Sequence, residues 1–333
     1  MSAAVPALRD EVTVVVITRD RPQMLRQALR SVLGQRGGPV PVVCVVDGTA
    51  GDTLAVLADF PAVQVVRHTL PSGPAAARNA GLAAVRTDWV AFLDDDDVWA
   101  PDKLLAQRRA LAAAPDARWC HTGAMALTAD LAPVGAMRAR HSGDVHAAIL
   151  AANVVCGGGS SVYAHTATVR AVGGFDPDVH RHEDWDLWIR LAAASPLAVV
   201  DRPLVGFRRH AASRSGVSVE SDAVRLLGRY EDERRRLGVT KISHYPLQAV
   251  HDNPVVRGSR LPFARGYIRA GVYHRSPRLL VASVGLLTFP RLLAAASRRR
   301  WRHRTPTAWF EEVATWLPPL ALRADADDHA LDV

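Results

Sequence analysis

Two runs of carboxylates contain the residues best suited to do chemistry. Asp94–Asp97 is a run of four aspartates directly after the apolar segment Ala91–Leu93, and Glu183–Asp186 places three acids within four residues. Four adjacent carboxylates repel one another unless water or a cation neutralises them. Magnesium and manganese favour hard oxygen ligands and complete their shells with phosphate oxygens. The first run therefore predicts a metal site.

Each run also has a purely structural interpretation. The four aspartates can form a solvated turn that caps a helix starting at Pro101. The acids at Glu183–Asp186 can simply complement the dipole of a helix that begins there. A position at the end of a buried strand favours the metal site for the first run. The second run divides evenly between a helix start and a general base that takes a proton from an attacking hydroxyl.

Alternating strands and helices position the first run. Val12–Ile17 is a continuous β-branched run, which is typical of a strand buried on both faces. Further strands are expected at Val42–Val46, Val63–Arg67 and Trp89–Leu93, with helices at Asp20–Leu33, Thr53–Asp59 and Pro74–Val85. This alternation predicts an α/β fold with a parallel sheet.

Polar residues follow three of these strands. They are Thr18–Arg21, Asp47 and Asp94–Asp97. Ligands of parallel sheets collect at the carboxyl ends of the strands, where the loops converge. We therefore expect these side chains to share one rim of the sheet.

The chain changes character beyond Ala152. A strand near Ser160–Tyr163, a helix to Val172, a helix from Glu183 and a strand at Leu197–Val200 are expected there. From about Glu220 the pattern is helical and rich in arginine. We predict a catalytic domain at 1–215, divided into halves at about 10–100 and 101–215, and a helical, basic region at 216–333.

Composition limits the class of protein. Hydrophobic residues make up 49% and charged residues 22% of the 333, which is typical of a folded protein. The three cysteines are isolated, so neither a disulfide framework nor a zinc site is indicated. The first ten residues lack the apolar core of a secretory signal, which favours a cytoplasmic location.

The C-terminal part carries much of the basic excess behind the net charge of +8. The apolar stretch Leu279–Ala296 precedes a basic run, Arg298–Arg304, that contains Trp301. The longest apolar run, Leu279–Pro290, is followed at once by Arg291 and falls short of the roughly 20 apolar residues that a spanning helix needs. One interpretation is peripheral attachment to an anionic membrane surface at the inner face of the cell membrane. The other is a helix pair packed on the catalytic domain.

The motifs taken together resemble glycosyltransferase family 2. The similarity covers about residues 10 to 210. It is carried by Val14–Pro22, Gly73–Gly81, Phe92–Trp99 and Gly173–Asp176 leading into Glu183-Asp184. The resemblance implies a GT-A fold and an inverting displacement on a nucleoside-diphosphate sugar, assisted by Mn²⁺ or Mg²⁺. A cation would stabilise the charge that develops on the leaving diphosphate.

The resemblance also implies roles for individual residues. It assigns Asp184 as the general base, with Asp186 as a rival, and Asp96 as the metal ligand. Contacts to the nucleotide sugar are implied for Thr18, Arg21, Asp47, Arg78, Asp94 and Asp95, with Asp95 on the ribose. Glu183, Asp186, Arg208 and His210 would belong to a loop near the diphosphate or the acceptor. For Arg208–His210 a solvated basic loop is the alternative.

The substrates stay open at this stage. Family members often have two acids before the glycine of the second-strand turn, whereas Val46–Thr49 has one, so UDP-, GDP- and dTDP-sugars all remain candidate donors. The acceptor could be a cell-surface glycan, a lipid-linked glycan or a small metabolite. The competing functions are a sugar nucleotidyltransferase and a non-catalytic protein that binds nucleotide or nucleic acid. The arginines lack interleaved aromatic platforms, so no nucleic acid is expected.

Overall fold

A computed structural model describes residues 11–48, 51–210, 219–240 and 301–320, with the single residues 268, 281, 284, 288 and 299. The strands are β1 (Val12–Thr18), β2 (Val42–Asp47), β3 (Val63–His68), β4 (Trp89–Asp94), β5 (Val98–Trp99), β6 (Trp119–Leu127), β7 (Pro133–Met137), β8 (Val162–His165) and β9 (Leu197–Arg208). The helices are α1 (Pro22–Leu33), α2 (Gly51–Ala58), α3 (Pro74–Ala84), α4 (Lys103–Ala112), α5 (His146–Ala151), α6 (Thr166–Ala171), α7 (Glu183–Ala194), α8 (Val219–Gly228), α9 (Glu231–Arg236) and α14 (Thr307–Trp316).

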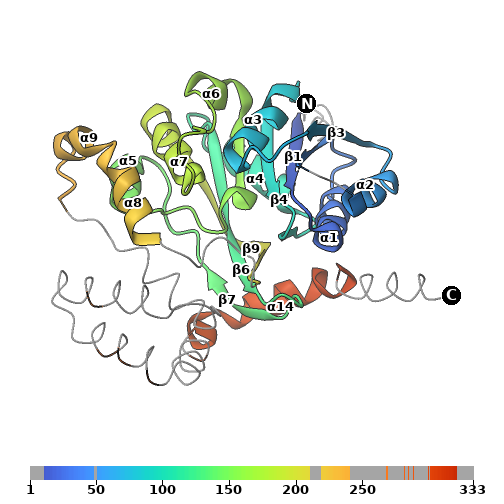
Figure 1. Cartoon of the computed structure of the whole chain (residues 1–333). Coiled ribbons are helices and arrows are strands. Elements are labelled where there is room, and N and C mark those ends of the chain that lie inside the picture. Colours follow the sequence, from blue (N-terminus) through green and yellow to red (C-terminus); the bar gives the residue numbers. More distant parts are fainter. Residues whose placement is uncertain are drawn as a thin grey trace, which may run out of the picture.

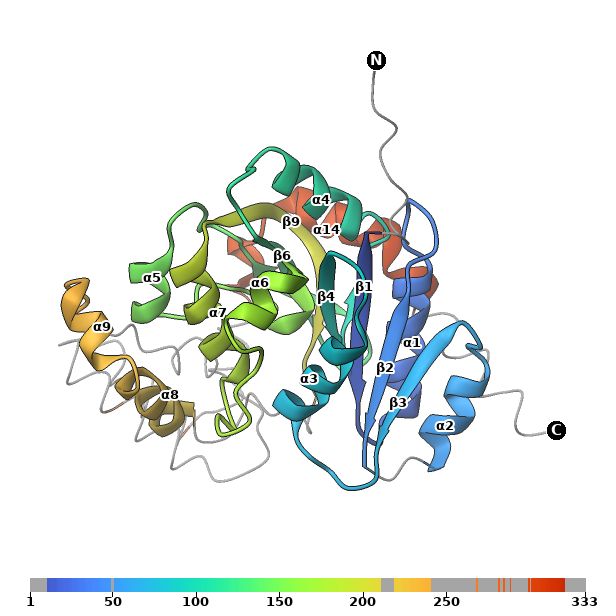
Figure 2. The ribbon, with the colours of Figure 1, turned by 90° about the horizontal axis from the view of Figure 1, so that it is seen from above.

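All these strands join one sheet in the order β3-β2-β1-β4-β8-β6-β9-β5, with β7 paired to β6. The first four neighbours run parallel, as the sequence predicts. Figure 2 shows α1 and α2 on one side of these strands and α3 on the other. The alternation of side chains along β1 explains this layering: Val14 and Val16 pack with Leu29 of α1, whereas Val15 packs with Leu82 of α3.

Beyond β4 the sheet is mixed rather than parallel. β8 runs antiparallel to both β4 and β6, while β6 runs parallel to β9. The predicted strand at Leu197–Val200 extends to Arg208, and β5, β6 and β7 were not predicted. All nine residues of β6 are buried, including His121 and Thr122, so the strand shows no alternation of apolar and polar positions. The prediction of a parallel sheet therefore holds for β1 to β4 and for the β6–β9 pair, but not for the pairs formed by β5, β7 and β8.

The C-terminal segment returns to the sheet. Figure 1 shows α14 lying beside β6, β7 and β9. The indole of Trp309 fills the space beside Gly123, where an added Cβ would lie 2.4 Å from the ring. Residues 301–320 therefore pack on the catalytic domain, as the second interpretation of the C-terminal part expected. The predicted apolar stretch Leu279–Ala296 lies almost wholly outside the described residues. Within the described parts of the chain, no helix has the length and apolar character needed to cross a membrane.

Helices α8 and α9 lie beside α5 and α7 (Figures 1 and 2). Arg229 donates to Asp176 at 2.6 Å, and His146 of α5 lies 3.1 Å from Glu233 of α9. The predicted domain boundary near Ser215 falls at 211–218, outside the described residues.

Candidate active site

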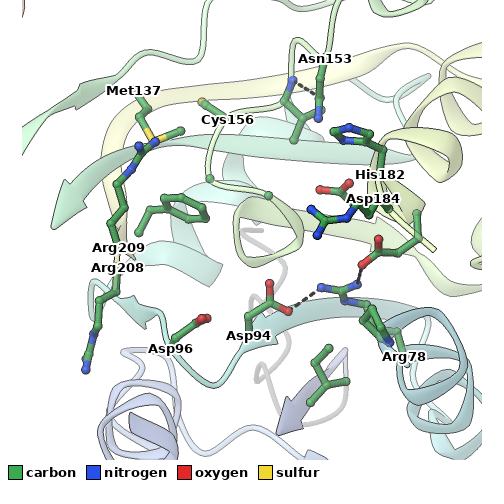
Figure 3. Close-up of a pocket in the computed structure, with 18 of the residues that line it drawn as sticks. Arg78, Asp94, Asp96, Met137, Asn153, Cys156, His182, Asp184, Arg208 and Arg209 are labelled. Atoms are coloured by element: carbon green, nitrogen blue, oxygen red, sulfur yellow. Dashed lines mark hydrogen bonds and ion pairs between the residues drawn. The ribbon is translucent and has the colours of Figure 1, made fainter. Parts of the chain in front are cut away.

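A cavity of about 1060 Å³ opens at the carboxyl ends of the parallel strands. It gathers residues from the ends of β1, β2 and β4, from the loop before α5 and the glycines after it, and from the start of α7 and the end of β9. Figure 3 shows Asp94 and Asp96 on one side of it, with Asp184 and His182 facing them. The rim expected from the sequence is therefore where the polar side chains converge.

Two of the four aspartates at the end of β4 and directly after it reach this cavity. Asp94 and Asp96 are half-buried and line it. Carboxylate oxygens of Asp94, Asp96 and Asp97 all lie within 4.8 Å of one another. A set of oxygens this close, open on one side to a cavity, fits a hard divalent cation that takes its remaining ligands from a phosphate or water. We call Asp94–Asp97 the acidic turn.

Asp95 and Asp97 point into the protein instead. Asp95 is fully buried and accepts a hydrogen bond from Thr18 Oγ1 at 2.6 Å, and it pairs with Arg21 at 2.5 Å. Burial raises the pKa of Asp95 to about 7, although Arg21 opposes the shift. Asp97 accepts from Ser160 Oγ at 2.6 Å and from the Arg208 amide at 2.9 Å. The pKa of Asp97 is also raised well above its usual range by burial.

The end of β9 meets the acidic turn from the other side. His210 Nε2 lies 2.9 Å from Asp96 Oδ2, and Arg21 Nη1 donates to the same oxygen at 2.5 Å. The Arg208 side chain is buried and donates to Gln27 at 2.6 Å. The interpretation of Arg208–His210 as a solvated basic loop is therefore wrong, because the segment is built into the site.

Arg78 joins the acidic turn to α7. Its side chain is 4% exposed, and its guanidinium donates to Asp94 Oδ1 at 2.6 Å and to Glu183 Oε1 at 3.0 Å. Dashed lines in Figure 3 mark both contacts. Burial alone would lower the pKa of Arg78, but the neighbouring carboxylates outweigh it and raise the pKa above its usual value. The guanidinium therefore stays charged. Arg78 lines the cavity, but both terminal nitrogens are used within the protein.

The first turn of α7 separates the two candidate bases. Asp184 lines the cavity, and Asp186 does not. Asp186 is buried and accepts hydrogen bonds from Arg190 at 2.5 Å and from Tyr230 at 2.7 Å. Burial, with the neighbouring Glu183 charge, raises the pKa of Asp184. Of the two carboxylates, only Asp184 is placed where it could take a proton from a bound molecule.

Comparison with known proteins identifies the part of the chain that carries the acidic turn. Residues 13–121 match the family described as Glycosyl transferase family 2. This region belongs to glycosyltransferase family 2. The predicted resemblance is confirmed here by a comparison that covers β1 through the first residues of β6.

Curated relatives extend the match. The pre-mycofactocin glycosyltransferase of Mycobacterium tuberculosis (strain H37Rv) is 33% identical over 218 residues, which cover 59% of this chain and 43% of that protein. Succinoglycan biosynthesis protein ExoO of Rhizobium meliloti is 40% identical over 96 residues, or 28% of each chain. The chain thus spans less than half the length of either relative.

Solved structures share the fold. Residues 1–349 of S. aureus TarS, in a complex with UDP-GlcNAc, align with a TM-score of 0.60 at 13% identity, covering 89% of this chain and 93% of that one. A longer TarS structure aligns with a TM-score of 0.57 at 15% identity and covers 88% and 55%. The predicted GT-A fold is confirmed.

Asp47, implied by the family 2 resemblance to contact the nucleotide, ends β2 at the cavity. Its carboxylate accepts the backbone amides of Ser72 at 2.8 Å and Gly73 at 2.9 Å, and lies 3.0 Å from His68 Nδ1. These contacts hold the loop before α3 against the end of β2. Thr18, at the end of β1, lines the cavity while its hydroxyl donates to Asp95.

Several lining residues were not assigned to a family 2 site from the sequence. His182 precedes α7 with a left-handed backbone (φ 63°) and stands beside Asp184 (Figure 3). Trp301 and Arg304 line the cavity from the C-terminal segment. The basic, tryptophan-bearing run was visible in the sequence, but nothing local links it to a cavity formed almost 100 residues earlier.

Proposed function

We propose that this protein is an inverting glycosyltransferase that moves a sugar from a nucleoside-diphosphate sugar to an acceptor hydroxyl. The observation that carries the proposal is the shared cavity of Asp96 and Asp184. One carboxylate stands where a cation and a diphosphate can meet, and the other where a hydroxyl can lose its proton. Asp186, the rival of Asp184, is instead buried against protein partners, as is Asp97 next to Asp96.

The donor half of the cavity would be built by β1, β2 and β4. Thr18, Asp47 and Asp94 line it at the strand ends, which suits a nucleotide lying across them. Asp94 is better placed than Asp95 to contact a ribose, because Asp95 is fully buried beneath the cavity. In this proposal Asp95 positions Thr18 and Arg21 instead.

Asp96, with Asp94 beside it, would hold Mn²⁺ or Mg²⁺. The bound cation would supply positive charge next to the leaving diphosphate. Arg21 and His210 contact Asp96 in this structure, so both would rearrange or share the carboxylate when a cation and a diphosphate are present. Either side chain could then donate to a phosphate oxygen.

Asp184 would act as the general base. A raised pKa brings a carboxylate closer to neutral pH and makes it a better proton acceptor. A direct attack by the activated hydroxyl inverts the anomeric centre, because the acceptor enters opposite the leaving diphosphate. Arg78 would hold the first turn of α7, and with it Asp184, at a fixed distance from the acidic turn, because it pairs with both Glu183 and Asp94.

The donor is sought first by binding. A screen of UDP-, GDP- and dTDP-sugars for thermal stabilisation, with and without manganese, should single out one nucleotide, and calorimetry should confirm that its affinity depends on the metal. Turnover should then release a nucleoside diphosphate. Release of pyrophosphate in a separate assay with a nucleoside triphosphate and a sugar 1-phosphate would indicate a nucleotidyltransferase, and no affinity for any sugar nucleotide with manganese present would refute the proposal.

The acceptor class and the location are separate proposals. Glycans, lipid-linked glycans and small metabolites all offer a hydroxyl that Asp184 could deprotonate. A cytoplasmic location with peripheral attachment to an anionic membrane surface would rest on 279–300, most of which lies outside the described residues.

A further inference from the structure

Acidic side chains line only one part of the cavity. Every acidic lining residue comes from 17–94, from Asp96 or from 183–184. The lining residues from 136–158, 207–209 and 301–304 include no carboxylate. Their arginines are Arg138, Arg140, Arg208, Arg209 and Arg304. These arginines make this part of the lining basic, and Figure 3 shows Arg209 and Met137 in it, across the cavity from Arg78.

Two of these arginines serve the protein itself. Arg138 forms a bidentate pair with Asp201, which neutralises it. Arg208 is buried beneath the cavity, donating to Gln27. In contrast, Arg140 and Arg304 are exposed, and neither has an acidic partner among the described residues. Exposed arginines left without counter-charges beside a cavity are suited to an anion supplied from outside.

Trp301 attaches the C-terminal segment to β7 beside these arginines. Its indole Nε1 donates to the Ala136 carbonyl at 2.9 Å, and the ring occupies the space beside Gly135, where an added Cβ would lie 2.6 Å from it. Thr305 Oγ1 accepts the Ala136 amide at 2.8 Å and donates to the Trp301 carbonyl at 3.0 Å. The guanidinium of Arg209 lies 5.3 Å from the centre of the Trp301 ring. The C-terminal segment is thus fixed to the edge of β7 and contributes a half-buried aromatic face to the cavity.

We call Arg140, Arg209, Arg304 and Trp301 the basic wall. We propose that the basic wall binds the acceptor, and that this acceptor carries a phosphate or carboxylate group held by Arg140 and Arg304 with an apolar ring face against Trp301. This inference rests on the proposed function, which it extends by giving the acceptor a charge. It also gives the C-terminal segment a role in the site.

The donor does not account for the basic wall. The diphosphate of a nucleotide sugar would lie at the acidic turn, where a cation, Arg21 and His210 supply positive charge. Arg140 and Arg304 belong to other segments, after β7 and before α14. A guanidinium binds a phosphate or carboxylate through two parallel hydrogen bonds, so arginine suits this task better than lysine.

The test compares a neutral sugar with two sugars of the same ring that carry an anionic group at C6. Binding of glucose, glucose 6-phosphate and glucuronic acid to the full chain is measured by saturation-transfer NMR, without any donor. The two anionic probes should bind more strongly than glucose. An Arg140→Glu, Arg304→Glu double variant should weaken binding of glucose 6-phosphate roughly three- to tenfold, as expected for the loss of exposed charge-assisted contacts.

Arg302→Glu is the matched control. It makes the same change of charge as Arg304→Glu in the same segment, two units against four in the double variant, but Arg302 does not line the cavity and its guanidinium lies 5.6 Å from the centre of the Phe310 ring. Arg302→Glu should leave probe binding unchanged. All variants should keep the melting temperature and the manganese-dependent donor affinity of the wild type, which shows that the fold and the donor site are intact.

A second arm identifies the source of the anion. Sedimentation with phosphatidylcholine vesicles, with and without phosphatidylglycerol, is measured for wild type and for the double variant. If wild type binds the anionic vesicles and the double variant does not, the anion belongs to a lipid headgroup. If only the soluble probes bind, the anion belongs to a free sugar.

Equal binding of glucose and glucose 6-phosphate, together with no preference for anionic vesicles, would overturn the proposal. An effect of Arg302→Glu as large as that of the double variant would also overturn it. Neither result changes the outcome of the donor-binding experiment, so failure of this inference is distinguishable from failure of the proposed function.

Discussion

The acidic turn and the first turn of α7 present carboxylates to the same cavity with different periodicities. In the acidic turn the aspartates alternate: Asp94 and Asp96 line the cavity, whereas Asp95 is buried behind them. On α7 the helical period instead puts Asp184 and Asp186 on different faces, since residues two apart are separated by about 200°.

In both runs, the carboxylates that miss the cavity are buried and held by side chains of the protein. Asp95 is held by Thr18 and Arg21, and Asp186 by Arg190 and Tyr230. A run of acids is therefore not a set of equivalent ligands. The inward members fix the backbone so that the outward members can bind, and substitutions at the two kinds of position should fail in different ways.

The largest effect is expected for Asp184→Asn. The substitution keeps the size and hydrogen-bonding capacity of the side chain but removes its basicity, so kcat should fall roughly 10²- to 10⁴-fold. Donor affinity measured by calorimetry should stay near that of the wild type. Asp186→Asn should lower kcat far less. Near-normal turnover of Asp184→Asn would move the base elsewhere.

Asp96→Asn should act on binding rather than on proton transfer. Losing one charged ligand oxygen should weaken manganese-dependent affinity for the donor roughly 10- to 100-fold. Asp95→Asn is the inward counterpart. It should lower the melting temperature and leave most of the manganese dependence in place. If calorimetry found the two variants equally impaired in metal dependence, the division of the acidic turn would be wrong.

Asp186→Ala should act on stability. The substitution leaves Arg190 and the Tyr230 hydroxyl without their shared acceptor, so urea denaturation should show a loss of about 2–3 kcal/mol in the free energy of unfolding. Asp232→Ala is the control, because its pair with Arg235 is exposed and should contribute less than about 1 kcal/mol. Equal losses in the two variants would mean that Asp186 has no special structural role.

How much of this arrangement the sequence predicts depends on the range of the interactions involved. β1 to β4 were predictable because each is a local apolar run bounded by turn signals, and α1 and α3 because Pro22 and Pro74 mark their first turns. The convergence of Asp47 with the acidic turn followed from the parallel sheet. The structural role of Asp186 could not be predicted in this way, since its contact with Tyr230 joins residues 44 positions apart in the sequence.

The second half of the sheet was harder for a physical reason. β6 buries polar residues such as His121 among its neighbours, so period-2 patterning is absent. The spaces that Trp301 and Trp309 occupy are left by Gly135 and Gly123, and a glycine in the sequence does not reveal which side chain will fill the space beside it. The prediction of a membrane-facing tail, which included Trp301, came from composition alone.

The smallest effect concerns the charge shared between the two runs. Glu183 raises the pKa of Asp184, whereas Arg78 lowers it. A general base works when deprotonated, so activity should rise with pH through the pKa of Asp184. Glu183→Gln removes the like charge, and the acidic limb of the kcat profile should therefore move to lower pH. Arg78→Met should move that limb to higher pH. Glu231→Gln, an exposed change on α9, should not move it. If the acidic limb of Glu183→Gln moved to higher pH instead, the variant would have lost the charge of Arg78 beside Asp184. Arg78 would then no longer connect Asp94 to α7.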